Sequence, residues 1–223
     1  MPRRPRYGMA GHIFHVMNRG SRRGLILETP AQYDAFVQVL REALERHPIR
    51  LLAFSPMPTH FHFVLWPTTD TQTPDFMHWL TATHAIRWRK SNDTVGQGAV
   101  YQGRYKAVPV QTDEHFLRVV RYVERNAVRA GLVGRAEDWR WGSLWHRHVA
   151  RDEFPLAQWP VACPEDWMAH VNRPQTPDEV AAIRRSINRG CAYGDASWQE
   201  EIAKTLGYRS TLRERGRHRR NSR

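Results

Sequence analysis

The sequence lacks the features that mark a secreted or membrane-embedded protein. Its 223 residues include only two cysteines, Cys163 and Cys191, which form no Cys-x-x-Cys pair, so we expect reduced thiols without a structural role. No apolar run is long enough to span a bilayer, and no signal peptide is visible. We therefore expect a cytoplasmic protein without a membrane partner.

Acidic side chains are few compared with basic ones, since 22 Asp and Glu face 34 Lys and Arg and leave a formal charge of +12. Most of this excess lies near the two ends: residues 1–10 contribute three positive charges and residues 209–223 contribute six. Basic arms of this kind can follow a phosphate backbone without reading its sequence. A flexible solubilising tail is the alternative interpretation of residues 209–223.

The most specific pattern in the chain is His60-Phe61-His62. On a strand, alternation places both imidazoles on one face and Phe61 on the other, so the two histidines form half of a metal site that stays free to bind. Polar residues on a solvated strand face would show the same spacing. Two common His-x-His sites are excluded, because Val64 to Pro67 provide neither the nearby Glu of a cupin-like site nor the acid and third histidine of a hydrolase.

A second polar cluster lies on a predicted helix that begins after Thr112 or Asp113 and ends at Gly131. At about 100° per residue, Tyr122 and Asn126 share its polar face, one turn apart. That face comprises His115, Arg118, Tyr122, Arg125, Asn126 and Arg129, and the opposite, apolar face comprises Phe116, Leu117, Val120, Val123, Ala127 and Val128. On the helix pattern alone, a surface tyrosine with its hydroxyl in water is the simpler interpretation.

In combination, these pieces resemble the HUH single-tyrosine transposases, in particular the branch of REP-associated tyrosine transposases. The resemblance covers residues 10–150. The matching segments are residues 15–20 (His-Val-Met-Asn-Arg-Gly), 57–62 (Met-Pro-Thr-His-Phe-His), 101–106 (Tyr-Gln-Gly-Arg-Tyr-Lys), 121–133 and 139–143 (Trp-Arg-Trp-Gly-Ser). Two positions depart from the common family pattern, which has Asn-Pro in place of Asn126-Ala127 and, in many members, Asn in place of Thr59.

The resemblance implies that Tyr122 is the nucleophile and that His60, His62 and Asn126 hold a metal ion. Two imidazole nitrogens and an amide oxygen acting on phosphate predict Mg²⁺ or Mn²⁺. The implied reaction cleaves single-stranded DNA that carries a REP-like hairpin, through a 5′-phosphotyrosine intermediate and a free 3′-OH. The implied protein is nucleoid-associated in the cytoplasm, and a monomer is expected rather than a dimer.

Basic and aromatic residues near these segments are predicted to contact DNA. They are Arg104, Tyr105, Lys106, Arg118, Arg125, Arg129, Arg215, Arg217 and Arg219, and Tyr101 belongs to the same aromatic and basic cluster as Arg104 to Lys106. Buried sheet tyrosines and solvated charges explain that cluster about as well. A domesticated protein that binds hairpin DNA or RNA without catalysis is the main functional alternative, and a hydrolase that uses metal-bound water is another.

The order of predicted elements indicates an α+β fold. Strands are expected at 11–18, 51–54, 60–66 and 105–110, and helices at 30–46, 74–90 and 113–131, with a capping box at Thr29 and a loop at 91–103. This order predicts a ferredoxin-like or RRM-like sandwich, with an antiparallel sheet and the helices packed on one of its faces. We expect a basic arm at 1–10, a catalytic domain at 11–150, a helical extension at 151–208 and an Arg-rich tail at 209–223.

In the extension, capping boxes at Thr176 and Ser197 predict two further helices, the second ending at residues 206–207. Their arginines Arg184, Arg185 and Arg189 are expected to face outward. The pair is interpreted either as a small DNA-contacting unit in the style of a helix-turn-helix or as helices that simply pack on the main domain.

Overall fold

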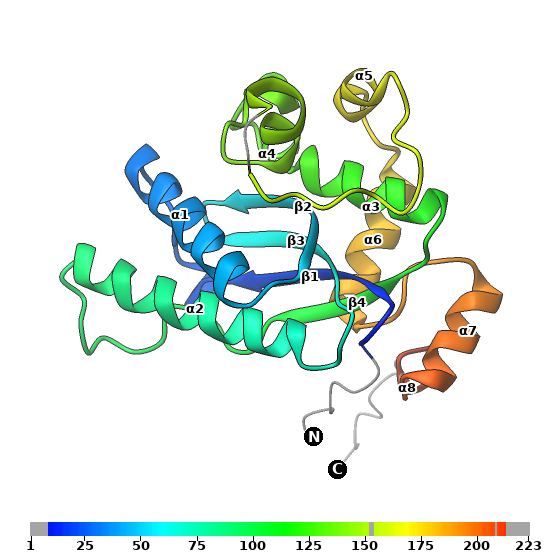
Figure 1. The fold of residues 1–223 in the computed structure, drawn as a ribbon, viewed down its shortest axis with the longest axis horizontal. Helices are drawn as coiled ribbons and strands as arrows, with labels where there is room; N and C mark the ends of the chain where they lie inside the picture. Colours follow the sequence, from blue (N-terminus) through cyan, green and yellow to red (C-terminus); the bar gives the residue numbers. More distant parts are fainter. Residues whose placement is uncertain (1–8, 152–153, 208, 213–223) are drawn as a thin grey trace, which may run out of the picture.

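A four-stranded antiparallel sheet is the framework of the structure, a computed structural model that describes residues 9–151, 154–207 and 209–212 (Figure 1). Its strands run in the order β2-β3-β1-β4. Their bounds are Ile13–Arg19 for β1, Arg50–Met57 for β2, His60–Trp66 for β3 and Lys106–Val110 for β4. This order and the helical connections between β1 and β2 and between β3 and β4 confirm the predicted ferredoxin-like α+β fold.

Helices α1 (Pro30–Arg46) and α2 (Gln72–Ser91) cover one face of the sheet. The predicted capping box starts α1, since the Gln32 N–H donates to Thr29 Oγ1 and the Thr29 N–H donates to Gln32 Oε1, both at 3.4 Å. Phe61 and Phe63 point into this core from β3 and lie beside Phe36 of α1. The strand alternation therefore sends the phenylalanines to one face, as predicted, and leaves the other face to the histidines.

The second face is covered too, so the prediction that the helices share one face is wrong. Helix α3 (Glu114–Glu124) packs across β2, β3 and β4 on the side opposite α1 and α2. The physical reason is that the second face is also apolar: Ile13, Val64, Val108 and Val110 are buried there and need a cover.

The predicted helix from 113 to 131 is interrupted. Asp113 is its N-cap and accepts a hydrogen bond from the His115 N–H at 2.7 Å. At Arg125 the backbone leaves helical geometry (φ −83°, ψ 1°), and a short helix α4 (Asn126–Arg129) follows before the left-handed Gly131. The interruption therefore falls between Tyr122 and Asn126, which still line the same cavity.

A buried carboxylate fixes the end of α3. Glu124 is 3% exposed; its two oxygens accept from Ser143 Oγ at 2.7 Å and from Trp167 Nε1 at 2.8 Å. Burial raises the pKa of Glu124, and the two hydrogen bonds oppose that shift. Glu124 thus ties α5 (Trp167–Asn172) and the segment after η2 (Ala136–Asp138) to the interrupted helix.

The C-terminal helices are α6 (Pro177–Arg189), α7 (Ala196–Thr205) and α8 (Arg209–Leu212). The predicted capping box opens α6, but the cap of α7 is Asp195 rather than Ser197, because Asp195 Oδ1 accepts from the Trp198 N–H at 2.8 Å. Ile183 and Ile187 bury α6 against the main domain. The interpretation as a helix packed on that domain is therefore right for α6.

The remaining helical segments are short: η1 is a 3₁₀ turn at Ser21–Arg23, and η3 is π-helical over Trp145–Ala150. Both cysteines are free. Within residues 9–151, 154–207 and 209–212, no helix combines the length and apolarity that a membrane span requires. The predicted domain boundaries stay predictions, and most of the two basic arms lies outside the described residues.

Replacing Trp167 by Phe should lower the free energy of unfolding by about 1–3 kcal/mol, because one Glu124 oxygen loses its donor in a buried site. Urea unfolding measures the loss. Trp145→Phe is the control, since the Trp145 indole has no hydrogen-bond partner among the described residues, and it should change stability by less than about 0.5 kcal/mol. Equal effects of the two variants would contradict the anchoring role of Glu124.

Candidate active site

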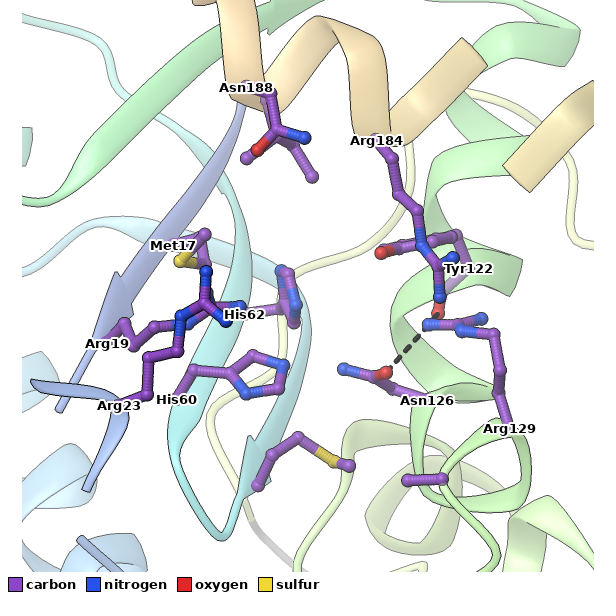
Figure 2. Close-up of a pocket in the computed structure, with 13 residues that line it drawn as sticks. Met17, Arg19, Arg23, His60, His62, Tyr122, Asn126, Arg129, Arg184 and Asn188 are labelled. Carbon is purple, nitrogen blue, oxygen red and sulfur yellow. Dashed lines mark hydrogen bonds between the residues drawn. The ribbon is translucent and has the colours of Figure 1, made fainter. Parts of the chain in front are cut away.

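A cleft of about 450 Å³ lies on the second face of the sheet (Figure 2). Strands β1 and β3 form one wall, α3 and α4 form the opposite wall, and α6 lies across the top of the view. The cleft brings together the four residues that the sequence predicts as the reaction centre, which are His60, His62, Tyr122 and Asn126.

The two histidines project from β3 into the cleft, with ring centroids 4.9 Å apart. His60 Nδ1 is 3.1 Å from Thr59 Oγ1, so its other ring nitrogen is left for the cleft. Burial, together with the charges of Arg19 and Arg129, lowers the pKa of His60 to about 4. Burial also holds the pKa of His62 well below its ordinary range. Both rings are therefore neutral at pH 7 and keep a lone pair available for a cation.

His62 is less free than the sequence suggests, because a third histidine contacts it. His15 Nε2 on β1 lies 2.8 Å from His62 Nδ1. Burial, and then the nearby Arg129 charge, lower the pKa of His15 to about 3. His15 therefore fixes one nitrogen of His62 and leaves the other toward the cleft. The contact of His15 with His62 depends on the register of β1 against β3, a tertiary property that the sequence pattern does not predict.

Tyr122 faces the histidines from α3. Its ring meets that of His62 edge-on, with centroids 5.7 Å apart and planes at 90°. The Arg129 guanidinium lies 4.0 Å from the centroid of the Tyr122 ring and donates to Asn126 Oδ1 at 2.7 Å (Figure 2). A second bond from Arg129 to the Tyr122 carbonyl, at 3.2 Å, spans the helix interruption. Arg129 thus holds the tyrosine and the asparagine in one arrangement.

The donor set fits a divalent cation. No group of three or more His, Cys, Asp or Glu suited to a metal occurs in the described parts of the chain, so a metal here would need Asn126 beside His60 and His62. The Asn126 Oδ1 accepts from Arg129 at 2.7 Å and keeps a second lone pair that a cation could use. Its Nδ2, buried without a partner among the described residues, is a donor that suits a phosphate oxygen instead. Two neutral imidazoles and one amide oxygen leave coordination positions open for a substrate.

Among the residues that the structure describes, four guanidinium groups and no Asp or Glu side chain line the cleft. They belong to Arg19, Arg23, Arg129 and Arg184. Four cations beside neutral histidines create a field that suits a polyanion such as a phosphodiester chain.

Arg23 reaches this cleft from a strained turn. Arg22 and Arg23 both have left-handed backbones, with φ of 53° and 61°, a conformation that non-glycine residues adopt at an energetic cost. The turn closes so tightly that a Cβ on Gly20 would lie 2.4 Å from the Gly24 carbonyl oxygen. Glycine at position 20 therefore permits the turn that presents Arg23.

The structure separates the predicted DNA-contacting residues. Arg129 lines the cleft, and Lys106 lies near enough to Arg19 for that charge, after burial, to lower the pKa of Lys106. Arg104 is exposed, whereas Tyr101 and Tyr105 are core residues. The Tyr101 hydroxyl lies 2.7 Å from His84 Nδ1, so the interpretation as buried sheet tyrosines is right for both.

Arg118 and Arg125 do not line the cleft. Arg118 pairs with Glu114 at 2.9 Å and lines a separate cavity, and Arg125 is half-buried at the helix interruption. Arg215, Arg217 and Arg219 lie outside the described residues.

Helix α6 contributes two residues to the cleft, a contact between distant segments that its sequence pattern did not predict. Arg184 and Asn188 both project from α6 toward the cleft (Figure 2). Arg184 and Arg185 are exposed, as predicted, and Arg184 also lines the cleft, while Arg185 and the half-buried Arg189 line the cavity that contains Arg118. Helical periodicity groups residues by face, but it does not say which other element that face meets.

Comparison with known proteins agrees with this geometry. The family model "Transposase IS200 like" matches residues 9–126, more than half of the chain, and the chain therefore belongs to the IS200-like transposase family. This confirms the predicted resemblance to the tyrosine transposases at the level of the family. No match was found among curated proteins.

Two solved structures are similar. One is a REP-associated tyrosine transposase bound to a REP hairpin, with a TM-score of 0.51 and 21% identity, over 70% of this chain and 89% of that chain. The other is a candidate transposase from Deinococcus radiodurans, with a TM-score of 0.40 and 19% identity, over 59% of this chain and 95% of that chain. The first shows that the chain has the fold of the REP-associated branch.

The buried histidines predict a loss of stability in acid. An unfolded histidine takes up a proton below about pH 6.5, whereas folded His15 stays neutral until about pH 3. The unfolded state therefore binds more protons than the folded state below about pH 6.5. Each such histidine lowers the free energy of unfolding by about 1.4 kcal/mol for every unit by which the pH falls. Urea titrations between pH 6 and 4.5, with EDTA present, should show that His15→Gln reduces this slope by one such increment.

The control for His15→Gln is His78→Gln, on the exposed side of α2, which should leave the slope unchanged. Identical slopes for wild type and His15→Gln would show that His15 is not held neutral in the folded protein.

Proposed function

We propose that this protein is a metal-dependent transposase of the REP-associated branch that cleaves and rejoins hairpin-bearing single-stranded DNA through Tyr122. The observation that carries the proposal is the composition of one cleft, in which a tyrosine faces two neutral histidines beside an amide ligand and four arginines. A site built only to bind DNA would need the arginines but not this combination.

The chain's own residues account for most of the chemistry. A phosphodiester reacts slowly with nucleophiles because negatively charged oxygens surround the phosphorus. Arg19, Arg129 and Arg184 would neutralise that charge. The Tyr122 oxygen attacks phosphorus and forms a phosphotyrosine bond while the bond to the 3′ oxygen breaks. The phenol loses a proton and the departing 3′ oxygen gains one, so the step needs no outside reactant. The phosphotyrosine conserves bond energy, and a free 3′-OH can reverse the step to join strands.

A tyrosine hydroxyl with the ordinary pKa of about 10 is a weak nucleophile at neutral pH. The Arg129 guanidinium against the Tyr122 ring favours the negative charge that builds up on the phenol oxygen during attack. His60, His62 and Asn126 would hold Mg²⁺ or Mn²⁺, which when bound polarises a non-bridging phosphate oxygen. His15 orients His62 through its ring nitrogen.

Three further expectations belong to this proposal. The hairpin substrate is supported by the similar structure, which is of a transposase bound to a REP hairpin. The four arginines support a nucleic acid partner and, with it, a nucleoid-associated protein in the cytoplasm. We propose a monomer because α3 packs on the sheet of its own chain and so brings Tyr122 to His62 without an exchange of helices between subunits.

Tyr122→Phe should abolish DNA cleavage and covalent attachment and leave hairpin binding within about threefold of wild type, since only the attacking oxygen is lost. Denaturing gels with labelled hairpin DNA from repeats flanking the protein's own gene, with Mg²⁺ or Mn²⁺, measure cleavage and adduct. Cleavage by Tyr122→Phe would favour a hydrolase that uses metal-bound water. Tight binding without cleavage by wild type would favour a non-catalytic hairpin-binding protein.

Removing the metal should stop cleavage by wild type, and adding back Mg²⁺ or Mn²⁺ should restore it. His60→Ala should reduce cleavage by at least about 100-fold at fixed metal, because one of three ligands is lost. His47→Ala is the matched control, since His47 lies at the end of α1 on the other side of the sheet. Full activity in EDTA without added metal would refute the metal requirement.

Arg184→Ala should weaken binding to hairpin DNAs of different sequence by similar factors, because a phosphate contact carries no sequence information. The slope of the logarithm of the binding constant against the logarithm of the salt concentration should fall by about one, since about one counterion fewer is released. Fluorescence anisotropy at several salt concentrations measures both quantities. Arg46→Ala, exposed at the end of α1, should leave both unchanged. An unaltered salt slope for Arg184→Ala would exclude Arg184 from the DNA interface.

A further inference from the structure

A second hollow, of about 460 Å³, lies beside the cleft and has a different chemical character. Its lining, within the described parts of the chain, is mainly apolar and aromatic, with no Lys or Arg and with Glu28 as the one charged residue. A lining without a cation is unsuited to a phosphate and suited to a flat, uncharged group.

Three aromatic rings form one side of this hollow. Tyr33 and Trp141 are stacked, with centroids 4.5 Å apart, and Trp139 meets Tyr33 edge-on at 5.1 Å. The two indole N–H groups are already used within the protein: Trp139 donates to the Pro56 carbonyl at 3.1 Å, and Trp141 donates to Asp34 at 2.7 Å. The rings are therefore held in place before any ligand arrives.

Two leucines of the hollow are unusually exposed. Leu25 is 48% exposed and Leu132 is 41% exposed, although both are large apolar residues. Exposed apolar side chains grouped beside fixed aromatic rings indicate a surface that becomes covered by a ligand.

The hollow and the cleft are neighbours because the same three segments line both. Each segment gives one residue to the cleft and another, one or two positions further on, to the hollow: Arg23 and Leu25, Met57 and Pro58, Ala130 and Leu132. Hydrogen bonds hold two of these segments together, since the N–H groups of Ile26 and Leu27 donate to the Pro58 carbonyl at 2.7 and 3.1 Å.

We infer that the hollow binds one unpaired nucleobase of the same DNA strand whose phosphodiester lies in the cleft. The inference rests on the proposed function, because it is the strand in the cleft that brings a base next to the hollow. Consecutive nucleotides of single-stranded DNA place a base within reach of each phosphate. A base in the hollow would pack against the exposed Leu25 and Leu132 and the half-buried Trp141, because Tyr33 and Trp139 are buried beneath them. Glu28 at the rim can accept a hydrogen bond from an exocyclic amino group, which adenine, cytosine and guanine have and thymine lacks.

The test combines abasic substitution of the DNA with variants of the exposed leucines. Hairpin DNA with single-stranded arms is prepared with one base removed at a time, and the dissociation constant is measured by anisotropy for wild type, Leu25→Ser, Leu132→Ser and the control Ile86→Ser. Ile86 is 69% exposed on α2. All three replaced side chains are exposed, so the variants should fold.

In wild type, removal of the base at one unpaired position should weaken binding roughly tenfold. Leu25→Ser and Leu132→Ser should weaken binding to intact DNA, and for them removal of that same base should have little further effect. Ile86→Ser should behave as wild type. The inference is overturned if no single position stands out, or if the same position keeps its full effect in both leucine variants.

Two parallel measurements distinguish base binding in the hollow from self-association and from the catalysis in the cleft. Sedimentation would overturn the inference in favour of self-association if wild type is a dimer and the leucine variants are monomers. Covalent adduct formation is measured on the same DNA, so that a wild type that forms the adduct but fails the base test refutes only the base site. Conversely, a base effect without any adduct supports the hollow and refutes the proposed catalysis.

Discussion

The packing of α3 across the second face of the sheet is the constraint on which the cleft depends. Apolar residues such as Val64 on that face need a cover, and Phe116 and Val120 of α3 provide it. Because α3 is held by this core, Tyr122 is carried to the histidines of β3, with its ring edge-on to His62. The buried Glu124 then fixes the end of the helix through Ser143 and Trp167, where the backbone turns to direct Asn126 into the same cavity.

The electrostatics of the cleft follow from this burial. Desolvation keeps His15, His60 and His62 neutral, so their ring nitrogens are available while positive charge comes from arginines. Arg129 connects the tyrosine to the predicted metal ligand, since it lies over the Tyr122 ring and donates to Asn126. A negatively charged phosphate would thus meet fixed guanidinium cations, an arrangement that stabilises charge during phosphoryl transfer, while the histidine lone pairs would serve to hold a metal ion.

Local sequence rules predicted much of this structure. The capping box at Thr29, the alternation that separates Phe61 from His60 and His62, and the spacing of Tyr122 and Asn126 all depend on near neighbours in the chain. These rules predicted the order of elements and which side chains share a face, whereas the union of His60, His62, Tyr122 and Asn126 in one site was implied by the family resemblance.

What the sequence could not predict depends on contacts between distant segments. The second-face position of α3, the pairing of His15 with His62 and the entry of Arg184 into the cleft require the strand register and the packing of α6. Tyr101 and Tyr105 resemble DNA-stacking residues in sequence, yet they are buried in the core that α1 and α2 form with the sheet. Arg19 and Arg23 also line the cleft only because the fold brings their segment next to α3, α4 and α6.

The most direct test of the central claim is mass spectrometry of wild-type protein after reaction with hairpin-bearing single-stranded DNA and Mg²⁺ or Mn²⁺. After nuclease and protease digestion, a nucleotide remnant should be attached through a phosphodiester to the peptide that contains Tyr122, with fragmentation locating the bond at Tyr122. A remnant on another residue, or products cleaved without any attached remnant, would contradict a mechanism in which this tyrosine is the nucleophile.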